Sequence, residues 1–149
     1  MPSDGLGLSH LPDSHRERLE WFAKHRGQEV PFPEPLPGGL HLATRAKGIY
    51  KPAGIDHALS VRVMISSPYA DKAVDRRPDG SWSLDYFQEN PDPGAGHDEY
   101  TNRAMVRCIT DQVPVGVLYQ TQAEPARYEV LGLAIVTGWS SGFFRLESC

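Results

Sequence analysis

The sequence has only two cysteines, Cys108 and Cys149, and lacks both a CxxC pair and a cysteine–histidine spacing suited to zinc. Its six histidines are dispersed, with no cysteine or carboxylate at metal-ligand spacing. No apolar run approaches the roughly 18 residues that span a bilayer, and Met1–Gly7 lacks the basic and apolar regions of a signal peptide. These absences argue against a disulfide framework, a metal or other cofactor, and a membrane partner, and they predict a cytoplasmic protein.

Turn-forming residues, in contrast, are abundant. Thirteen prolines and fourteen glycines fall between short apolar runs, which is typical of many turns and short strands rather than of a helical bundle. The apolar fraction of 40% and the charged fraction of 23% are those of an ordinary soluble globular protein. A length of 149 residues suffices for one domain with a hydrophobic core.

The net charge of −4 at first argues against a nucleic-acid partner. The charge is unevenly spread, however. Residues 40–77 carry seven basic and three acidic side chains, a local charge of +4, which leaves −8 for the remainder. The local field decides where a polyanion docks, so this segment is the candidate docking region. On charge alone, a solvated face with scattered ion pairs is the alternative interpretation.

The first 39 residues read as a helix followed by a connector. Asp13 and Ser14 precede the amphipathic segment HRERLEWFAKHR, which predicts an N-capped helix that ends near Gly27. Pro31–Gly39 is too rich in proline and glycine for regular structure, so we expect an extended connector there.

From residue 40 to residue 149 the pattern favours strands. Alternation predicts a half-buried strand at Ala58–Ile65 and another strand at Trp82–Phe87, with a loop at Asn90–Gly96. A helix capped at Asp98 or a close neighbour should follow, with Cys108 on its apolar side. Further strands are expected at residues 115–119, 128–136 and 143–146. The predicted fold is one compact α+β unit: a twisted sheet or partial β-barrel with two or three helices.

Several segments, taken in order, carry a family resemblance. They are Lys47-Gly-Ile-Tyr-Lys-Pro52, Asp56-His-Ala-Leu-Ser-Val61, Ser66-Ser-Pro-Tyr-Ala-Asp71, Leu84-Asp-Tyr-Phe87, Thr101-Asn-Arg-Ala-Met105, Val113-Pro-Val-Gly-Val-Leu118, Tyr128 and Gly142-Phe143. Over roughly residues 47–146 this order resembles the SRA (SET- and RING-associated) domain, a PUA-like reader of 5-methylcytosine. The matching family segments are "GI", a strand and turn ending in a tyrosine and acidic residues, "YTG", "NRAL", "PVRV" and "GF".

The resemblance implies that the protein flips a modified cytosine, 5-methyl- or 5-hydroxymethylcytosine, out of double-stranded DNA. Tyr69 and Tyr86 match the family's two stacking tyrosines, and stacking offsets the cost of extruding a base. A carboxylate accepts from the cytosine amino group, and Asp71 is the candidate for that role. It lies two residues after Tyr69 where the family spacing is three, a position that Lys72 takes here, so Asp75 is the reserve choice. The implied pocket consists of Ser66, Ser67, Tyr69, Asp71, Tyr86 and Phe87.

The same resemblance implies a surface that contacts the DNA backbone, with Ile55 as the wedge that fills the gap left by the flipped base. Its residues are Lys47, Tyr50, Lys51, Ile55, His57, Lys72, Arg76 and Arg103. The N-terminal segment is similar to the front end of reader modules in bacterial McrA-type restriction endonucleases, where an HNH nuclease is fused to the reader. These 149 residues contain no HNH motif. The prediction is therefore a non-catalytic targeting module, joined to a nuclease domain or forming a homodimer through it.

Two alternatives stay open from the sequence. A related PUA-like module would bind RNA or another modified base through a similar sheet and basic strip. A small metal-dependent hydrolase would instead use clustered acids such as Asp85, Glu89, Asp98 and Glu99. The tryptophans Trp21, Trp82 and Trp139 are expected to pack in the core or at its edge rather than to serve as stacking platforms.

Overall fold

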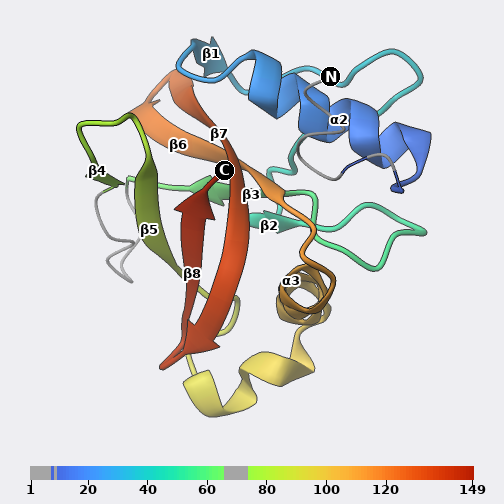
Figure 1. Ribbon diagram of the computed structural model, residues 1–149, viewed down its shortest axis with the longest axis vertical. Helices are drawn as coiled ribbons and strands as arrows, with labels where there is room; N and C mark the ends of the chain where they lie inside the picture. The colour runs from blue at the N-terminus through green and yellow to red at the C-terminus, as the bar shows by residue number, and fades with distance from the viewer. Residues whose placement is uncertain (1–7, 9, 66–73) are drawn as a thin grey trace.

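The computed structural model describes residues 8, 10–65 and 74–149, and within them the chain forms an open mixed sheet of eight strands with two α-helices (Figure 1). This is the predicted α+β class, and the sheet does not close into a barrel. The helices are α2 (Asp13–Lys24) and α3 (Tyr100–Asp111), and a 3₁₀ helix (Pro93–Asp98) precedes α3. The strands are β1 (Glu29–Pro31), β2 (Ile49–Tyr50), β3 (Ser60–Val63), β4 (Asp75–Arg76), β5 (Trp82–Phe87), β6 (Val115–Ala123), β7 (Ala126–Ser140) and β8 (Phe143–Ser148).

The strands follow the order β2-β3-β6-β7-β8-β5-β4, and β1 pairs with β7 beside this path. β3 and β6 run parallel, whereas the other pairs are antiparallel. A parallel pair needs a long crossover, and here the crossover carries β4, β5 and α3. β1 belongs to the segment predicted as an N-terminal helix and connector, so that segment joins the same sheet as the rest of the chain.

The helix α2 begins and ends close to its expected limits. It starts at Asp13, but Pro12 is the N-cap residue and no side chain caps the helix, so the expected side-chain cap at Asp13–Ser14 is wrong. Proline is tolerated there because the first backbone N–H groups of a helix have no intrahelical partner. Leu19 and Phe22 are fully buried against β6 and β7. Phe22 packs so closely on Gly116 that a Cβ at this position of β6 would overlap its ring.

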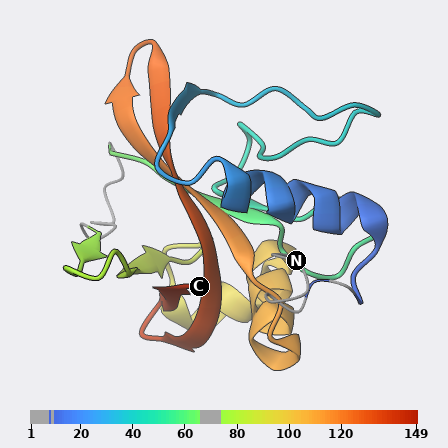
Figure 2. The same cartoon turned by 45° about the horizontal axis from the view of Figure 1, so that its top comes forward.

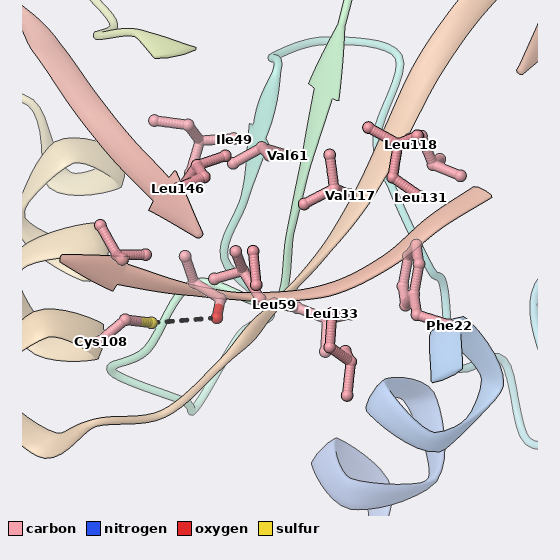
Figure 3. Close-up of a cluster of buried hydrophobic side chains, with 14 of the residues drawn as sticks. Phe22, Ile49, Leu59, Val61, Cys108, Val117, Leu118, Leu131, Leu133 and Leu146 are labelled. Carbon is pink, nitrogen blue, oxygen red and sulfur yellow. Dashed lines mark hydrogen bonds between the residues drawn. The ribbon is translucent and has the colours of Figure 1, made fainter. Parts of the chain in front are cut away.

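The core lies where the curved sheet meets α3 and α2 (Figure 3). In the register between β3 and β6, Val61 lies opposite Val117, and both pack in one cluster with Ile49 and Leu146. Cys108, fully buried on α3 as its apolar position predicted, donates to the carbonyl oxygen of Ala58 at 3.4 Å. Burial raises the pKa of this thiol to about 12, so it behaves as a small apolar group in the core.

The strand β3 differs from its expected half-buried state, because all four of its residues are buried. One face carries Val61 and Val63. The other carries Ser60 and Arg62, on the same side as Gly116, which α2 covers. These polar side chains are buried with partners: the Ser60 hydroxyl donates to the carbonyl oxygen of Leu42 at 2.7 Å, and Arg62 donates to several neutral acceptors. The alternation correctly predicted which residues of β3 share a face, but it did not show that the polar face is covered as well.

The segment between β5 and α3 is more ordered than the predicted loop. It contains the 3₁₀ helix Pro93–Asp98, and Glu99 rather than Asp98 is the N-cap residue of α3, without a side-chain cap. Asn102 is fully buried, and its amide exchanges hydrogen bonds with both backbone groups of Glu89 and donates to the carbonyl oxygen of Gly96 at 2.8 Å. Asn102 therefore holds the start of α3 against the end of β5.

No helix in the part of the chain that the structure describes is long and apolar enough to cross a bilayer.

Candidate nucleic-acid interface

A groove of about 680 Å³ runs between the segment that follows β2 and the outer face of α3. We call it the α3 groove. Its polar and aromatic lining consists of Lys51, Asp56, His97, Tyr100, Arg103, Arg107 and Trp139. Asp56 is the single carboxylate among the described residues that line it. The groove therefore combines a positive lining with two aromatic rings.

The cations around the α3 groove are largely free of carboxylate partners. The ammonium of Lys47 lies 5.5 Å from the centre of the Tyr100 ring, and Tyr100 is 49% exposed. Lys51 donates to the carbonyl oxygen of Pro52 at 3.3 Å, and Arg103 donates to that of His97 at 3.0 Å. Cations held only by neutral acceptors can exchange them for phosphate oxygens at little cost. Three of the predicted backbone-contacting residues, Lys47, Lys51 and Arg103, are thus brought together.

Trp139 enters this groove from β7 and is held rigidly. Its ring stacks on Phe144, with the ring centres 4.9 Å apart and the planes 14° from parallel. Its indole nitrogen donates to the amide oxygen of Gln88 at 2.8 Å. It also lines a second, smaller cavity of about 260 Å³ together with His97. The expectation that Trp139 packs at the core edge is therefore incomplete, because one side of the residue also lines the groove.

Ile55 and His57 lie in a different cavity, of about 480 Å³, on the side of the same loop that faces the start of α2. We call it the His15 cavity. His57 and Asp111 are hydrogen-bonded, with Nε2 and Oδ2 2.7 Å apart, and this hydrogen bond lowers the pKa of Asp111. His15 is 1% exposed, and neither ring nitrogen has a partner among the described residues. Burial, with His57 and Arg18 nearby, lowers the pKa of His15 to about 4.

The predicted base pocket is described only in part, because Ser66, Ser67, Tyr69, Asp71 and Lys72 lie outside the described residues. Tyr86 is buried on β5, and its hydroxyl reaches the backbone at Gly48, where a Cβ would collide with it. Phe87 is half-buried, with its ring edge-on to Phe143 at 5.1 Å. The reserve carboxylate Asp75 is exposed on β4.

Arg76 and Tyr50 lie apart from the α3 groove. Arg76 is on β4, at the opposite end of the strand order from β2, and both of its terminal nitrogens donate to the carboxylate of Glu129, at 2.8 and 3.2 Å. Tyr50 is half-buried on β2 and lines another cavity, together with Phe32 and Arg45.

The acids proposed for a hydrolase have separate partners. Asp85 pairs with Arg145 at 3.4 Å, and Asp98 approaches His97 at 3.7 Å. Glu89 accepts from the backbone of β2, and Glu99 accepts from the side chain of Asn90. Within the described ranges, no group of three histidine, cysteine or acidic side chains is arranged to hold a metal ion.

Sequence reasoning missed Tyr100, Arg107 and Trp139. The first two could have been found, because Tyr100, Arg103 and Arg107 share one helix face at spacings of three and four residues. Trp139 could not, because it reaches the groove only through the packing of β7 against α3, which lie far apart in the sequence. No protein-family model matches this chain, and neither a curated protein nor a solved structure matches it.

Proposed function

We propose that this protein binds double-stranded DNA that contains 5-methyl- or 5-hydroxymethylcytosine, flips the modified base into an aromatic pocket, and serves as the non-catalytic targeting module of a restriction system. The observation that carries the DNA-binding part is the convergence of Lys47, Lys51 and Arg103, none with a carboxylate partner in the described residues, beside the exposed ring of Tyr100.

The chemistry of the α3 groove suits a nucleic-acid backbone. Binding phosphates to lysine and arginine releases condensed counterions, which supplies most of the sequence-independent affinity. Aromatic rings next to these cations offer stacking surfaces for sugars or unstacked bases. Tyr100 and Trp139 provide such rings in the lining of the groove.

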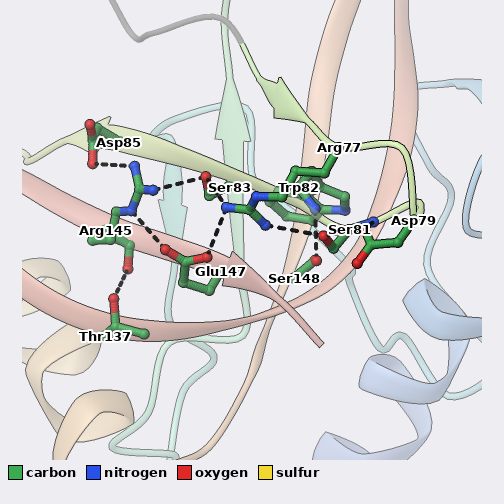
Figure 4. A network of polar contacts seen from close by, with 10 residues as sticks. All are labelled: Arg77, Asp79, Ser81, Trp82, Ser83, Asp85, Thr137, Arg145, Glu147 and Ser148. Carbon is green, nitrogen blue, oxygen red and sulfur yellow. Dashed lines mark hydrogen bonds and ion pairs between the residues drawn. The ribbon is translucent and has the colours of Figure 1, made fainter.

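An acidic net charge is compatible with this function because several carboxylates of the sheet are paired with arginines of the sheet. On β5 and β8, Arg145 donates to both Asp85 and Glu147, and Arg77 donates to Glu147 (Figure 4). Arg76 and Arg127 are likewise paired with Glu129 and Glu29. The carboxylates of the sheet thus neutralise its own arginines, whereas the cations beside α3 keep their field.

The choice of modified cytosine as the target depends on the ordered SRA-like motifs of the sequence. Tyr86 supports it in one respect, since its ring lies beside the Gly48 segment from which Lys47 and Lys51 project. In the SRA reading, this is the segment that follows the DNA backbone while the base enters the pocket.

The direct test is binding to matched duplexes in which one cytosine is unmodified, 5-methylated or 5-hydroxymethylated, at fixed salt and without divalent metal. We expect a modified duplex to bind at least tenfold more tightly, a difference of about 1.4 kcal/mol. Equal affinity for all three duplexes would refute the reader. Tighter binding to RNA of the same sequence would favour the RNA-binding alternative, and cleavage on addition of magnesium would favour the hydrolase.

Two variants locate the interface. Lys51→Ala and Arg103→Ala should weaken binding to all three duplexes alike, and each should reduce the salt dependence of log Kd by about one phosphate contact. Arg127→Ala is the matched control. It removes the same charge, but from an arginine of β7 that is already paired with Glu29 of β1. If the control weakens binding as much as the two variants, the α3 groove is not the interface.

A further inference from the structure

The arginines of the described residues fall into two groups by their partners. Six of them form an ion pair with a carboxylate: Arg16, Arg76, Arg77, Arg107, Arg127 and Arg145. The other five have no carboxylate partner in the described part of the chain, and three of these converge on the segment 41–46. Arg18 donates to the carbonyl oxygen of His41, Arg62 donates to two carbonyl oxygens of the segment, and Arg45 belongs to it.

Arg62 is buried without a counter-ion in the described part of the chain. It is 8% exposed, and its terminal nitrogens donate to the Met64 sulfur, the Tyr128 hydroxyl, and the carbonyl oxygens of Thr44 and Arg45. Its Nε has no partner among the described residues. All of these acceptors are neutral. A buried guanidinium that lacks a counter-ion is energetically unfavourable, and its field extends to the surface beside it.

That surface is hollow. Phe32, His41, Thr44, Arg45, Ala46 and Tyr50 line a cavity of about 390 Å³, which we call the Phe32 cavity. The guanidinium carbon of Arg45 lies 4.0 Å from the centre of the Phe32 ring, and that of Arg62 lies 5.9 Å from the same centre. No acidic side chain is among the described residues of its lining. Two guanidinium charges thus act on a concave site, which concentrates a positive potential there.

We propose that the Phe32 cavity is a phosphate-binding site. Arg45 offers a planar fork of donors that matches two oxygens of a phosphate, and Thr44 and Tyr50, which line the same cavity, carry hydroxyls that can donate as well. The buried charge of Arg62 gains its missing counter-ion when the cavity is filled. The volume exceeds that of a bare phosphate ion, and the rings of Phe32 and Tyr50 accommodate the group esterified to it.

The place of the cavity identifies the source of the phosphate as the DNA backbone, an assignment that depends on the proposed function. Tyr50 is the last residue of β2 and Lys51 follows it directly, and consecutive side chains of an extended chain point to opposite sides. Tyr50 lines the Phe32 cavity, and Lys51 lines the α3 groove. A DNA strand that crosses residues 45–51 therefore meets cations on both sides of this segment of the protein.

The first arm of the test needs no DNA. Inorganic phosphate should raise the Tm of the protein above its value in sodium chloride of equal ionic strength, because the anion binds the folded state alone. Arg45→Ala should raise the Kd for phosphate about tenfold or more and abolish this rise, whereas Arg26→Ala should retain it. Arg26 is the matched control, because it is exposed, lacks a carboxylate partner in the described residues and donates instead to the carbonyl oxygen of Gly80. No rise of Tm with phosphate, or an equal loss in both variants, overturns the proposal.

The second arm measures binding to an unmodified duplex across a range of salt. Arg45→Ala should lower the salt slope by about one phosphate contact, and the double variant with Lys51→Ala should lose about two. This result assigns the site to the DNA backbone. If phosphate stabilises the protein through Arg45 but the slope is unchanged, the site binds a free phosphate ester and the DNA assignment is wrong. The first arm does not depend on base modification. Its result therefore tests the phosphate site separately from the proposal that the protein reads modified cytosine.

Discussion

Replacing His15 with leucine should remove a large part of the pH dependence of stability between neutral and mildly acidic solution. The imidazole is 1% exposed, both ring nitrogens lack partners among the described residues, and its pKa is lowered from 6.5 to about 4. The folded protein therefore binds this proton less tightly than the unfolded chain does. The stability that His15 contributes by staying neutral is fully present above about pH 6.5 and is lost as the pH falls towards about 4.

The size of the effect follows from the two pKa values. Lowering the pKa from 6.5 to about 4 corresponds to about 3.4 kcal/mol in total. About 2 kcal/mol of this is lost between about pH 7.5 and about pH 5. Asp111 also lines this cavity, and its hydrogen bond from His57 lowers its pKa from the usual aspartate range, so its loss of charge falls below this window. Urea unfolding of the wild type and of His15→Leu at both pH values measures the difference.

The same variant should be tolerated at neutral pH. Leu11, Pro12, Ile55 and Val113 share the cavity lining, and an apolar side chain there removes two buried nitrogens that have no described partner. At about pH 7.5 the free energy of unfolding of His15→Leu should therefore lie within about 1 kcal/mol of the wild-type value or exceed it. The control, His97→Leu, replaces a side chain that is 72% exposed and should keep the wild-type pH dependence. A His15→Leu variant that keeps that dependence, or that loses more than about 2 kcal/mol at neutral pH, would refute the reasoning.

Two further changes test the fold. Asn102→Ala removes three hydrogen bonds that the fully buried side chain of Asn102 makes to Glu89 and Gly96, in the segment between β5 and α3, so urea unfolding should show a loss of about 3 kcal/mol. A loss below about 1 kcal/mol would mean that this segment finds other partners. Gly116→Ala puts a Cβ into the phenylalanine ring of α2, whereas Gly138→Ala meets no atom within 4 Å. The first should therefore cost about 1–3 kcal/mol in the same assay and the second almost nothing, and equal losses would contradict the packing described.

Local patterns predicted the elements whose residues both alternate and face the core. Trp82–Phe87 was predicted at its exact limits, and the helix that carries Cys108 was predicted with the correct buried face. The strands β6 and β7 were predicted too short, because their paired ends carry exposed polar residues such as Thr121 and Gln122 that show no apolar alternation. These ends form a hairpin that projects from the sheet (Figure 2), and backbone pairing rather than burial defines it.

The candidate site was only partly predictable for a different reason. Lys47, Lys51 and Arg103 were found because they lie in short motifs, but the groove that joins them also needs Trp139 from β7. Arg62 was counted only as one of the local positive charges. Its burial follows from the covering of β3 by the segment 41–46, whose carbonyl oxygens accept from Ser60 and Arg62. No alternation within β3 itself encodes that cover. Contacts between segments far apart in the chain therefore carried the part of the site that the motifs did not.

Net charge is a poor guide to the partners of this protein. It counts charges that are neutralised by a neighbouring ion-pair partner together with charges that are not. Arg145 lies between Asp85 and Glu147, and these contacts raise its pKa, so its charge reaches little beyond β5 and β8. The guanidinium of Arg45 carries the same formal charge, and it lies over the Phe32 ring beside the Phe32 cavity. No acidic side chain among the described residues of that lining cancels its charge. An approaching polyanion meets the uncancelled field. A chain of net charge −4 can therefore present a positive face along residues 45–51, and pairing of the remaining charges within the fold is what makes that face distinct.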